Sequence, residues 1–215
     1  VKVLVVEKSS TNAIANPQAD GREIALTHLS LKILKKLGVW KLIDQDEVSP
    51  LKEAKVFDGD SPSLLNFKSD ESSIEALGYL VPNYQVRQAL YQRVNQADNI
   101  TLMTEAMVDD VECLGDYSKV LFADGRSAKT KLVIAADSRF SNIRRKVGIP
   151  SLMKDFSKVM IVTKMEHEHS HNNTALECFD YGQTLALLPM VGNASSVVLT
   201  VATNKAQAML NMTEA

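Results

Sequence analysis

The chain has 215 residues, and its 45% hydrophobic content is sufficient to bury a core in one or two globular domains. Its 24 basic and 26 acidic residues give a net charge of −2 without a run of like charge, which argues against nucleic acid as a partner. No stretch of 18 apolar residues and no signal-peptide pattern is present, which limits any membrane contact to a peripheral one. The two cysteines, Cys113 and Cys178, have no disulfide-framework or metal-ligand spacing and favour a reducing, cytoplasmic compartment.

The first predicted element is a buried parallel strand at 1–6, because VKVLVV is rich in β-branched residues. Glu7 ends this strand. In dinucleotide-binding folds an acid at such a strand end accepts hydrogen bonds from ribose hydroxyls, and a glycine-rich turn lies about 20 residues upstream. No GxGxxG occurs in the sequence, so the residues alone favour a solvated strand-end carboxylate. An exposed edge on this strand would favour association, which leaves a homo-oligomer open.

The next predicted element is an amphipathic helix, because apolar residues recur at helical spacing from Ile24 to Leu37, and Gly38 ends the pattern. Arg22 stands before the expected first turn, where backbone N–H groups attract anions. An ordinary surface arginine is the alternative. Short alternating runs separated by turn residues then predict an antiparallel insertion at about 51–82.

Helical spacing returns at 83–97, with Arg87 in the first turns. A strand, a β-meander that turns at Asp124-Gly125 and a fully buried strand at 132–137 are predicted to follow. Four more strand-like runs between 156 and 203 predict an antiparallel sheet with one apolar face, beginning near Ser151 after the break at Pro150.

Four separated segments together resemble one known family. They are DGREIALTHLSLKILKKLGVW at 20–40, LGYLVPNYQVRQALYQRV at 77–94, LVIAADSRFSNIRRKVGI at 132–149 and LALLPM at 185–190. Their order and spacing resemble the class A FAD-dependent aromatic hydroxylases, in the ubiquinone-biosynthesis hydroxylase branch. This resemblance implies an α/β fold of the para-hydroxybenzoate-hydroxylase type, with a Rossmann-like FAD/NAD(P)-binding domain at 1–150 and an antiparallel substrate-domain sheet at 151–215. Both domains are expected to be incomplete, because the family's GxGxxG turn and C-terminal part have no counterpart here.

The resemblance also implies roles for individual residues in binding FAD. Glu7 corresponds to the acid that binds the ribose, since a carboxylate accepts from vicinal hydroxyls. Arg22 corresponds to the arginine beside the flavin and its phosphates, and Arg87 to the residue at the pyrophosphate. Val108 would offer its backbone to the adenine.

Asp137 corresponds to the aspartate of the family's DG motif, which contributes to FAD and NAD(P)H binding, and Arg144 is the matching arginine that anchors the following loop. Ser138 stands where the family has glycine, the residue that most readily adopts a positive φ. The alternative for Asp137 is a capping role at a helix that begins near Ser141.

The reaction that the resemblance implies is reduction of FAD by NAD(P)H, followed by O2-dependent hydroxylation of an electron-rich ring. The cofactor supplies the chemistry, so no catalytic side chain and no metal are expected. Leu185, Leu187 and Pro189 are expected to line the pocket for the aromatic substrate, and their apolar character suits a polyprenylated phenol. Peripheral membrane contact and membership of a ubiquinone-biosynthesis complex are compatible with this reading.

One pattern could indicate a metal site. His167, His169 and His171 alternate and would share a face on a strand, although a solvated hairpin tip is the simpler account. Two other functions also stay open. One is another flavoprotein of the same fold, such as a reductase or halogenase, and the other is a non-catalytic module that binds a partner or a phenol without flavin.

Overall fold

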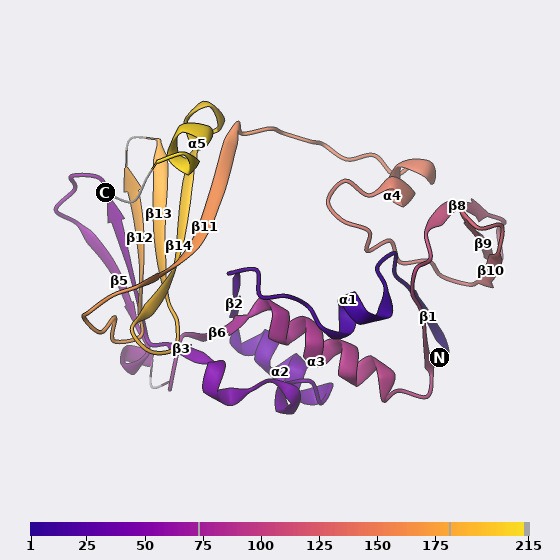
Figure 1. The fold of residues 1–215 in the computed structure, drawn as a ribbon, viewed down its shortest axis with the longest axis horizontal. Coiled ribbons are helices and arrows are strands. Elements are labelled where there is room, and N and C mark those ends of the chain that lie inside the picture. Colours follow the sequence, from indigo (N-terminus) through magenta and orange to yellow (C-terminus); the bar gives the residue numbers. More distant parts are fainter. Residues whose placement is uncertain (73, 181, 213–215) are drawn as a thin grey trace. The chain divides into compact units, whose positions relative to one another are not determined.

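The computed structural model describes residues 1–72, 74–180 and 182–212 and has a mixed α/β fold (Figure 1). Contacts divide the chain into two compact units. The first unit comprises Val1–Asn16 and Val94–Lys154, and the second comprises Pro17–Arg93 and Asp155–Ala215. Each unit has its own sheets and its own hydrophobic core.

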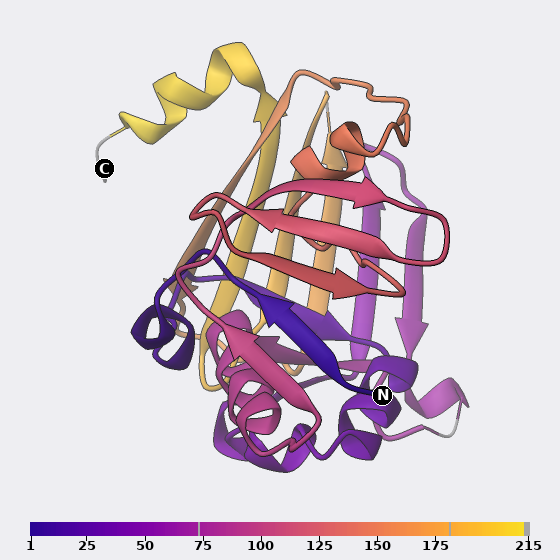
Figure 2. The ribbon, with the colours of Figure 1, turned by 90° about the vertical axis from the view of Figure 1, so that its right-hand side faces the viewer.

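The first unit contains a parallel pair of strands and a three-stranded antiparallel sheet (Figure 2). The parallel pair is β1 (Val3–Val6) with β7 (Ile100–Met103), and the sheet has the order β10 (Ser127–Thr130), β9 (Ser118–Phe122), β8 (Val108–Cys113). Two short helices, α1 (Thr11–Ala15) and α4 (Asn142–Lys146), complete the unit. The predicted turn at Asp124-Gly125 is confirmed, and Gly125 has a φ of 86°.

The core of the first unit lies between its antiparallel sheet and α4. Four buried residues form it: Val111, Val120, Phe122 and Ile143. Val6 of β1 and Met103 of β7 pack against this cluster, so the parallel pair is attached to the sheet through apolar contacts.

Two predictions of buried strands in this unit were wrong. The strand at 1–6 forms and is parallel as predicted, but Val3, Leu4 and Val5 are 42%, 39% and 37% exposed, because β7 is its only partner among the described strands. The segment 132–137 forms no strand, and Leu132 and Ile134 are 72% and 81% exposed. Its apolar run lacks a neighbouring strand in the described chain, and only Val133 reaches the core. An apolar run predicts a buried strand only where pairing partners exist.

The second unit contains a six-stranded sheet and a three-stranded antiparallel sheet. The six-stranded sheet has the order β11 (Lys158–Glu166), β14 (Ala194–Ala202), β13 (Gln183–Pro189), β12 (Thr174–Asp180), β4 (Glu53–Asp58), β5 (Leu64–Lys68). The smaller sheet has the order β2 (Glu23–Leu26), β6 (Gly78–Pro82), β3 (Ser49–Leu51). The helices are α2 (His28–Lys36), α3 (Asn83–Asn95) and α5 (Thr203–Leu210), with 3₁₀ turns η1 (Trp40–Leu42), η2 (Gln45–Glu47) and η3 (Asp70–Ser72).

The second core joins the smaller sheet to the helices and turns around it. Its buried residues are Leu26, Val39, Ile43, Val81 and Ala89. Gly78 permits the close approach of β6 to β2, because a Cβ at this position would lie 2.7 Å from the backbone oxygen of Leu26.

The predicted helix from Ile24 to Leu37 was wrong in its first part. Residues 23–26 form β2, and the helix begins only at His28, where the Thr27 side chain accepts a hydrogen bond from the backbone N–H of Ser30. Ile24 and Leu26 fit a helical period as well as an alternating strand, so periodicity could not separate the two. The helix ends as predicted before Gly38, which has a φ of 72°.

The predicted insertion at 51–82 does not form a separate piece of the first domain. The hairpin of β4 and β5 is antiparallel as predicted, but β4 also pairs in parallel with β12 and so extends the C-terminal sheet. The strands predicted after Phe156 are confirmed as antiparallel neighbours, β11 with β14, β14 with β13 and β13 with β12. Contacts therefore group 17–93 with the residues after 154, instead of with the first unit.

None of the described helices is long and apolar enough to cross a membrane. Cys113 is exposed and Cys178 is partly buried, and both are free thiols.

Candidate functional site

In the first unit, Glu7 lies immediately after β1 and is held in place by its backbone and its side chain. Its N–H donates to Met103 O at 2.8 Å, and its carbonyl accepts from Ala106 N at 3.1 Å. The carboxylate oxygen Oε1 accepts from the backbone N–H of Ser9 at 2.7 Å, and this bond lowers the pKa of Glu7. The strand therefore ends in a fixed, ionised acceptor.

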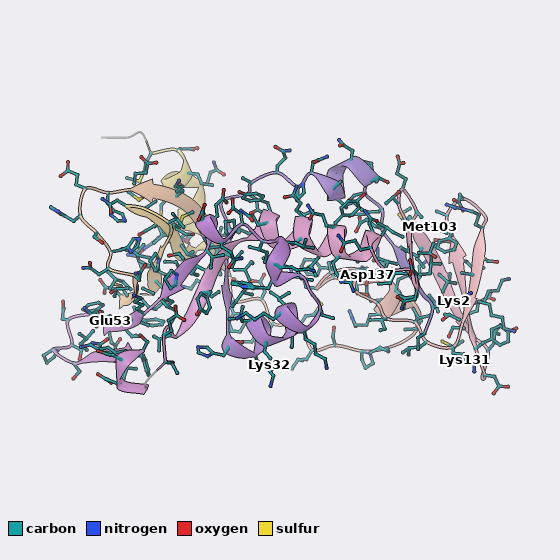
Figure 3. All side chains as sticks on the ribbon, turned by 90° about the horizontal axis from the view of Figure 1, so that it is seen from below. Lys2, Lys32, Glu53, Met103, Lys131 and Asp137 are labelled. Atoms are coloured by element: carbon teal, nitrogen blue, oxygen red, sulfur yellow. The ribbon has the colours of Figure 1, made fainter. Side chains whose placement is uncertain are left out.

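Asp137 occupies the coil that leads into α4 (Figure 3). Its Oδ2 accepts from the backbone N–H groups of Asn142 at 2.9 Å and Ile143 at 3.2 Å. Ser141, the residue before the helix, accepts from Arg144 N at 3.0 Å. A hydrogen bond from Ser141, followed by those from the backbone, lowers the pKa of Asp137. The structure thus gives Asp137 the capping role considered as the alternative, with the helix beginning at Asn142.

The two residues that flank this aspartate in the motif also have defined conformations. Ser138 has a φ of 101°, in the region that favours glycine. Arg144 extends its guanidinium to Ile149, where Nη1 donates to the carbonyl oxygen at 2.6 Å. Arg144 therefore holds the loop after α4.

Val108 is the first residue of β8 and is partly buried against the core of the first unit. It pairs with Phe122, and the register shifts between Val108 and Asp110. This irregularity breaks the regular ladder beside Val108.

In the second unit, Arg22 precedes β2 instead of a helix, so the predicted position beside a helix N-terminus was wrong. Its guanidinium is paired with Asp20, with Nε and Nη2 lying 2.8 and 2.5 Å from Oδ2. The hydrogen bond from Arg22 lowers the pKa of Asp20 to about 2. Arg87 lies exposed on α3, and its guanidinium has no hydrogen bond or ion pair with any described residue.

Leu185, Leu187 and Pro189 alternate along β13 and therefore share one face of the six-stranded sheet. On that face they lie opposite Leu199, Val197 and Ser195 of β14, and Leu185 and Leu187 lie opposite Cys178 and Leu176 of β12. This gives the sheet a mostly apolar patch across its central strands. Pro189 is fully buried at the end of the row.

A group of acidic residues in the second unit had not been predicted. Glu47 Oε2 accepts hydrogen bonds from the Tyr84 hydroxyl at 2.5 Å and from Gln85 Nε2 at 2.7 Å. Burial, with the charges of Glu47 and Asp20, raises the pKa of Glu23 to about 7. These residues come from β2, η2 and α3. The three elements are brought together only by the tertiary fold, and no local sequence pattern indicates that these side chains lie close to one another.

The histidine pattern does not form a metal centre within the described residues. His167 Nε2 lies 3.1 Å from Ser195 Oγ, and its Nδ1 lies 2.5 Å from His169 O. His171 Nε2 lies 2.8 Å from Met190 O, while its Nδ1 accepts from Asn173 N at 3.0 Å. The His167 ring thus joins the β11–β12 loop to β14, and the His171 ring joins this loop to the residue that follows β13.

No family model matches the sequence. By structure, the chain is similar to proteins of the FAD-dependent monooxygenase fold. Pseudomonas aeruginosa PqsL, described as a probable FAD-dependent monooxygenase, matches with a TM-score of 0.76 and 17% identity over 96% of this chain and 56% of PqsL. Klebsiella pneumoniae HpxO, in a complex with FAD and uric acid, matches with a TM-score of 0.70 and 17% identity over 98% of this chain and 60% of HpxO.

By sequence, the chain is 40% identical over 216 residues to the ubiquinone hydroxylase UbiM of Neisseria meningitidis, covering 99% of this chain and 47% of UbiM. It is 32% identical over 200 residues to the ubiquinone hydroxylase UbiL of Rhodospirillum rubrum, covering 93% of this chain and 46% of UbiL. The chain is therefore similar, over nearly its whole length, to two proteins named as ubiquinone hydroxylases. The chain spans about half the length of these curated relatives.

Proposed function

We propose that this chain acts in an FAD-dependent monooxygenase that hydroxylates the aromatic ring of a ubiquinone precursor. The observation that carries the proposal is the 40% identity to a ubiquinone hydroxylase over nearly the whole chain. NAD(P)H would supply two electrons, and one oxygen atom of O2 would enter the ring while the other leaves as water. Bound FAD would supply the redox chemistry with O2.

The polar residues of the first unit fit the ribose end of such a cofactor. Glu7 is an ionised acceptor at the end of a parallel strand, suited to two ribose hydroxyls. Val108 lies beside a break in strand pairing, which supports our assignment of its backbone to the adenine. For Asp137 we propose a positioning role, because its Oδ2 already caps α4, and Arg144 then fixes the loop that follows.

The polar residues of the second unit fit a diphosphate unequally. Arg87 is exposed and unpaired within the described residues, so its guanidinium can bind an anion without breaking an existing contact. Arg22 is already paired with Asp20, so a phosphate would have to share or replace that carboxylate. We therefore assign the stronger phosphate contact to Arg87.

The apolar patch on β13 supports the proposed substrate class. Leu185 and Leu187 offer no charge to a ligand, and their cross-strand neighbours are mainly apolar, whereas Pro189 lies buried at the end of the row. Such a surface excludes water and suits a phenol with an apolar substituent, such as a polyprenyl chain. We place the reaction in the cytoplasm, and the apolar substrate would require contact with a membrane surface or with other enzymes of ubiquinone biosynthesis.

The experiment is to purify the natural protein and measure bound flavin and NAD(P)H oxidation with substituted phenols under ¹⁸O2. Incorporation of one ¹⁸O atom into the ring, with FAD present, is the expected result. Flavin reduction without ring labelling would indicate another flavoprotein of this fold. Phenol binding without flavin would indicate a non-catalytic module, and either outcome would reject the proposed reaction.

A further inference from the structure

The outer strand β11 is the longest open edge of the six-stranded sheet. It has nine residues and pairs only with β14 among the described strands. Figure 1 shows it at one side of the sheet. The opposite edge, β5, has five residues. An open edge presents unpaired backbone groups that can bind another strand.

The hydrogen bonds at the two ends of β11 show which of its backbone groups point outward. His167 N donates to Asn193 O at 2.9 Å, and Thr203 N donates to Ser157 O at 3.0 Å. The backbone N–H and C=O groups of the odd-numbered positions therefore point toward β14. Because the pattern alternates along an antiparallel strand, even-numbered positions from Lys158 to Glu166 direct N–H and C=O away from the sheet. In the part of the chain that the structure describes, only one of these outward groups has a hydrogen bond: Lys164 O accepts from Thr163 Oγ1 at 3.5 Å.

The sequence of β11 is complementary to itself in one antiparallel register. When two copies are related by a twofold axis through Val162, Lys158 of each lies opposite Glu166 of the other. On the same face, Met160 lies opposite Lys164 and covers the methylene part of that side chain. On the other face, Val159 lies opposite Met165 and Ile161 opposite Thr163. Every outward-facing residue then exchanges backbone hydrogen bonds with an outward-facing residue.

Exposure of the side chains agrees with a surface available for pairing. Met160 is 65% exposed and Met165 is 55% exposed, although both are apolar. The Lys158 ammonium donates to Gly182 O, which fixes it near the strand end, and an ammonium has further donors for a carboxylate. Glu166 is exposed and has no ion pair within the described residues.

We propose that two copies of this chain associate through β11, as an antiparallel pair about an axis through Val162 that joins their six-stranded sheets. Lysines on an edge strand normally oppose pairing. In the register that pairs all nine residues of β11, however, Lys158 of one copy lies opposite the carboxylate of Glu166 of the other. The other outer strand of this sheet lacks such a pattern, because antiparallel pairing of β5 about Asn66 would place Leu64 opposite Lys68.

The first test measures the dissociation constant of self-association of the full chain by analytical ultracentrifugation. Lys158→Glu and Glu166→Lys each create two like-charge pairs in the dimer, and each should weaken association about tenfold. The double variant Lys158→Glu/Glu166→Lys restores opposite charges and should recover the original constant. Glu71→Lys in η3 has the same change in charge as Glu166→Lys but lies away from β11, and it should leave the dissociation constant unchanged. Circular dichroism checks that each variant is folded.

A second test locates the axis by disulfide formation in a Cys113→Ser/Cys178→Ser background. Val162→Cys places the two thiols opposite each other, whereas Met165→Cys places its two thiols about 20 Å apart along the strands. A covalent dimer is expected only with Val162→Cys. A chain that is monomeric over the whole concentration series, a double charge variant that fails to recover, or equal cross-linking at both positions would overturn the proposal.

Discussion

The Tyr84 hydroxyl donates a 2.5 Å hydrogen bond to Glu47 Oε2, an oxygen that also accepts from Gln85 Nε2. These bonds hold a negative charge near Glu23 on β2. Glu23 is itself partly buried, and its pKa is raised to about 7 by burial first and by Glu47 second. In this region the helix α3 therefore positions one carboxylate so that it opposes the ionisation of another.

Glu23→Gln should remove a pH-dependent loss of stability. The pKa of Glu23 is near 4.5 in the unfolded chain and about 7 in the folded protein. The stabilising contribution of this raised pKa to the free energy of unfolding is therefore complete below about pH 4.5 and is lost as the pH rises through 7. We expect the variant and the parent to have the same free energy of unfolding near pH 4.5. At pH 8 the free energy of unfolding of the variant should be larger by about 1–2 kcal/mol. This is less than the full value of about 1.4 kcal/mol per pKa unit, because water screens a partly exposed group. Urea titrations at several pH values measure it, with Glu71→Gln as the control. An unchanged pH dependence would contradict the raised pKa.

Ser138→Gly should stabilise the first unit. Ser138 has a φ of 101°, which is strained for a residue with a Cβ, and its hydroxyl accepts only a 3.4 Å bond from Phe140 N. Glycine would relieve strain of about 1 kcal/mol, partly offset by its greater freedom in the unfolded chain. Urea denaturation should show a gain of about 0.5–1 kcal/mol. Gly148→Ser, at a φ of 75°, is the matched reverse change and should destabilise. A loss of stability in Ser138→Gly would show that this turn is not strained.

The capping role and the proposed cofactor role of Asp137 can be separated by two substitutions. Asp137→Ala removes the acceptor for Asn142 N and Ile143 N and should cost about 0.5–2 kcal/mol. Asp137→Asn keeps an oxygen acceptor, and since asparagine caps about as well, its stability should stay within about 0.5 kcal/mol. If the charge also serves the cofactor, the asparagine variant should still bind FAD more weakly. Equal affinity in parent and asparagine variant would assign Asp137 to capping alone.

The sequence predicted elements well where local pattern and pairing agree, and badly where pairing depends on distant residues. The β8–β10 meander and the helix at 83–95 follow from turn residues and periodicity, and both are confirmed. The run at 132–137 has the composition of a buried strand, but a strand requires a neighbour, and no described strand pairs with it. Parallel pairing of β4 with β12 joins residues more than 100 positions apart, and no local signal encodes such a pair.

The same distinction applies to the candidate site. Glu7 and Asp137 are candidates from the sequence because each follows an apolar run, and their roles toward FAD remain predictions. The group of Glu23, Glu47 and Tyr84 could not be predicted, because three separate elements supply it. Periodicity also gave no indication that Arg22 is neutralised by Asp20, two residues away in an irregular loop.

Gly78→Ala should separate β6 from β2. A Cβ would lie 2.7 Å from Leu26 O, and because that atom is backbone the strand itself must move. Strain of this kind in a packed core costs about 1–3 kcal/mol. Gly115→Ala is the control, since Gly115 has a φ of 78° with open space around it and tests strain without a clash. Urea denaturation should show the larger loss for Gly78→Ala, and equal losses would remove the argument from close approach.

Arg87 and Arg93 lie on the same helix and provide a matched pair for the proposed flavin contact. Arg93 Nε donates to Leu37 O at 2.8 Å and so supports the end of α2. Arg93→Ala should cost about 1 kcal/mol of unfolding free energy. Arg87→Ala removes an exposed side chain without a described partner, so stability should change by less than about 0.5 kcal/mol. Loss of a charged contact to a diphosphate should instead weaken FAD binding at least about tenfold. Flavin fluorescence titration of both folded variants decides the assignment, because an Arg87→Ala variant with unchanged FAD affinity would place the diphosphate elsewhere.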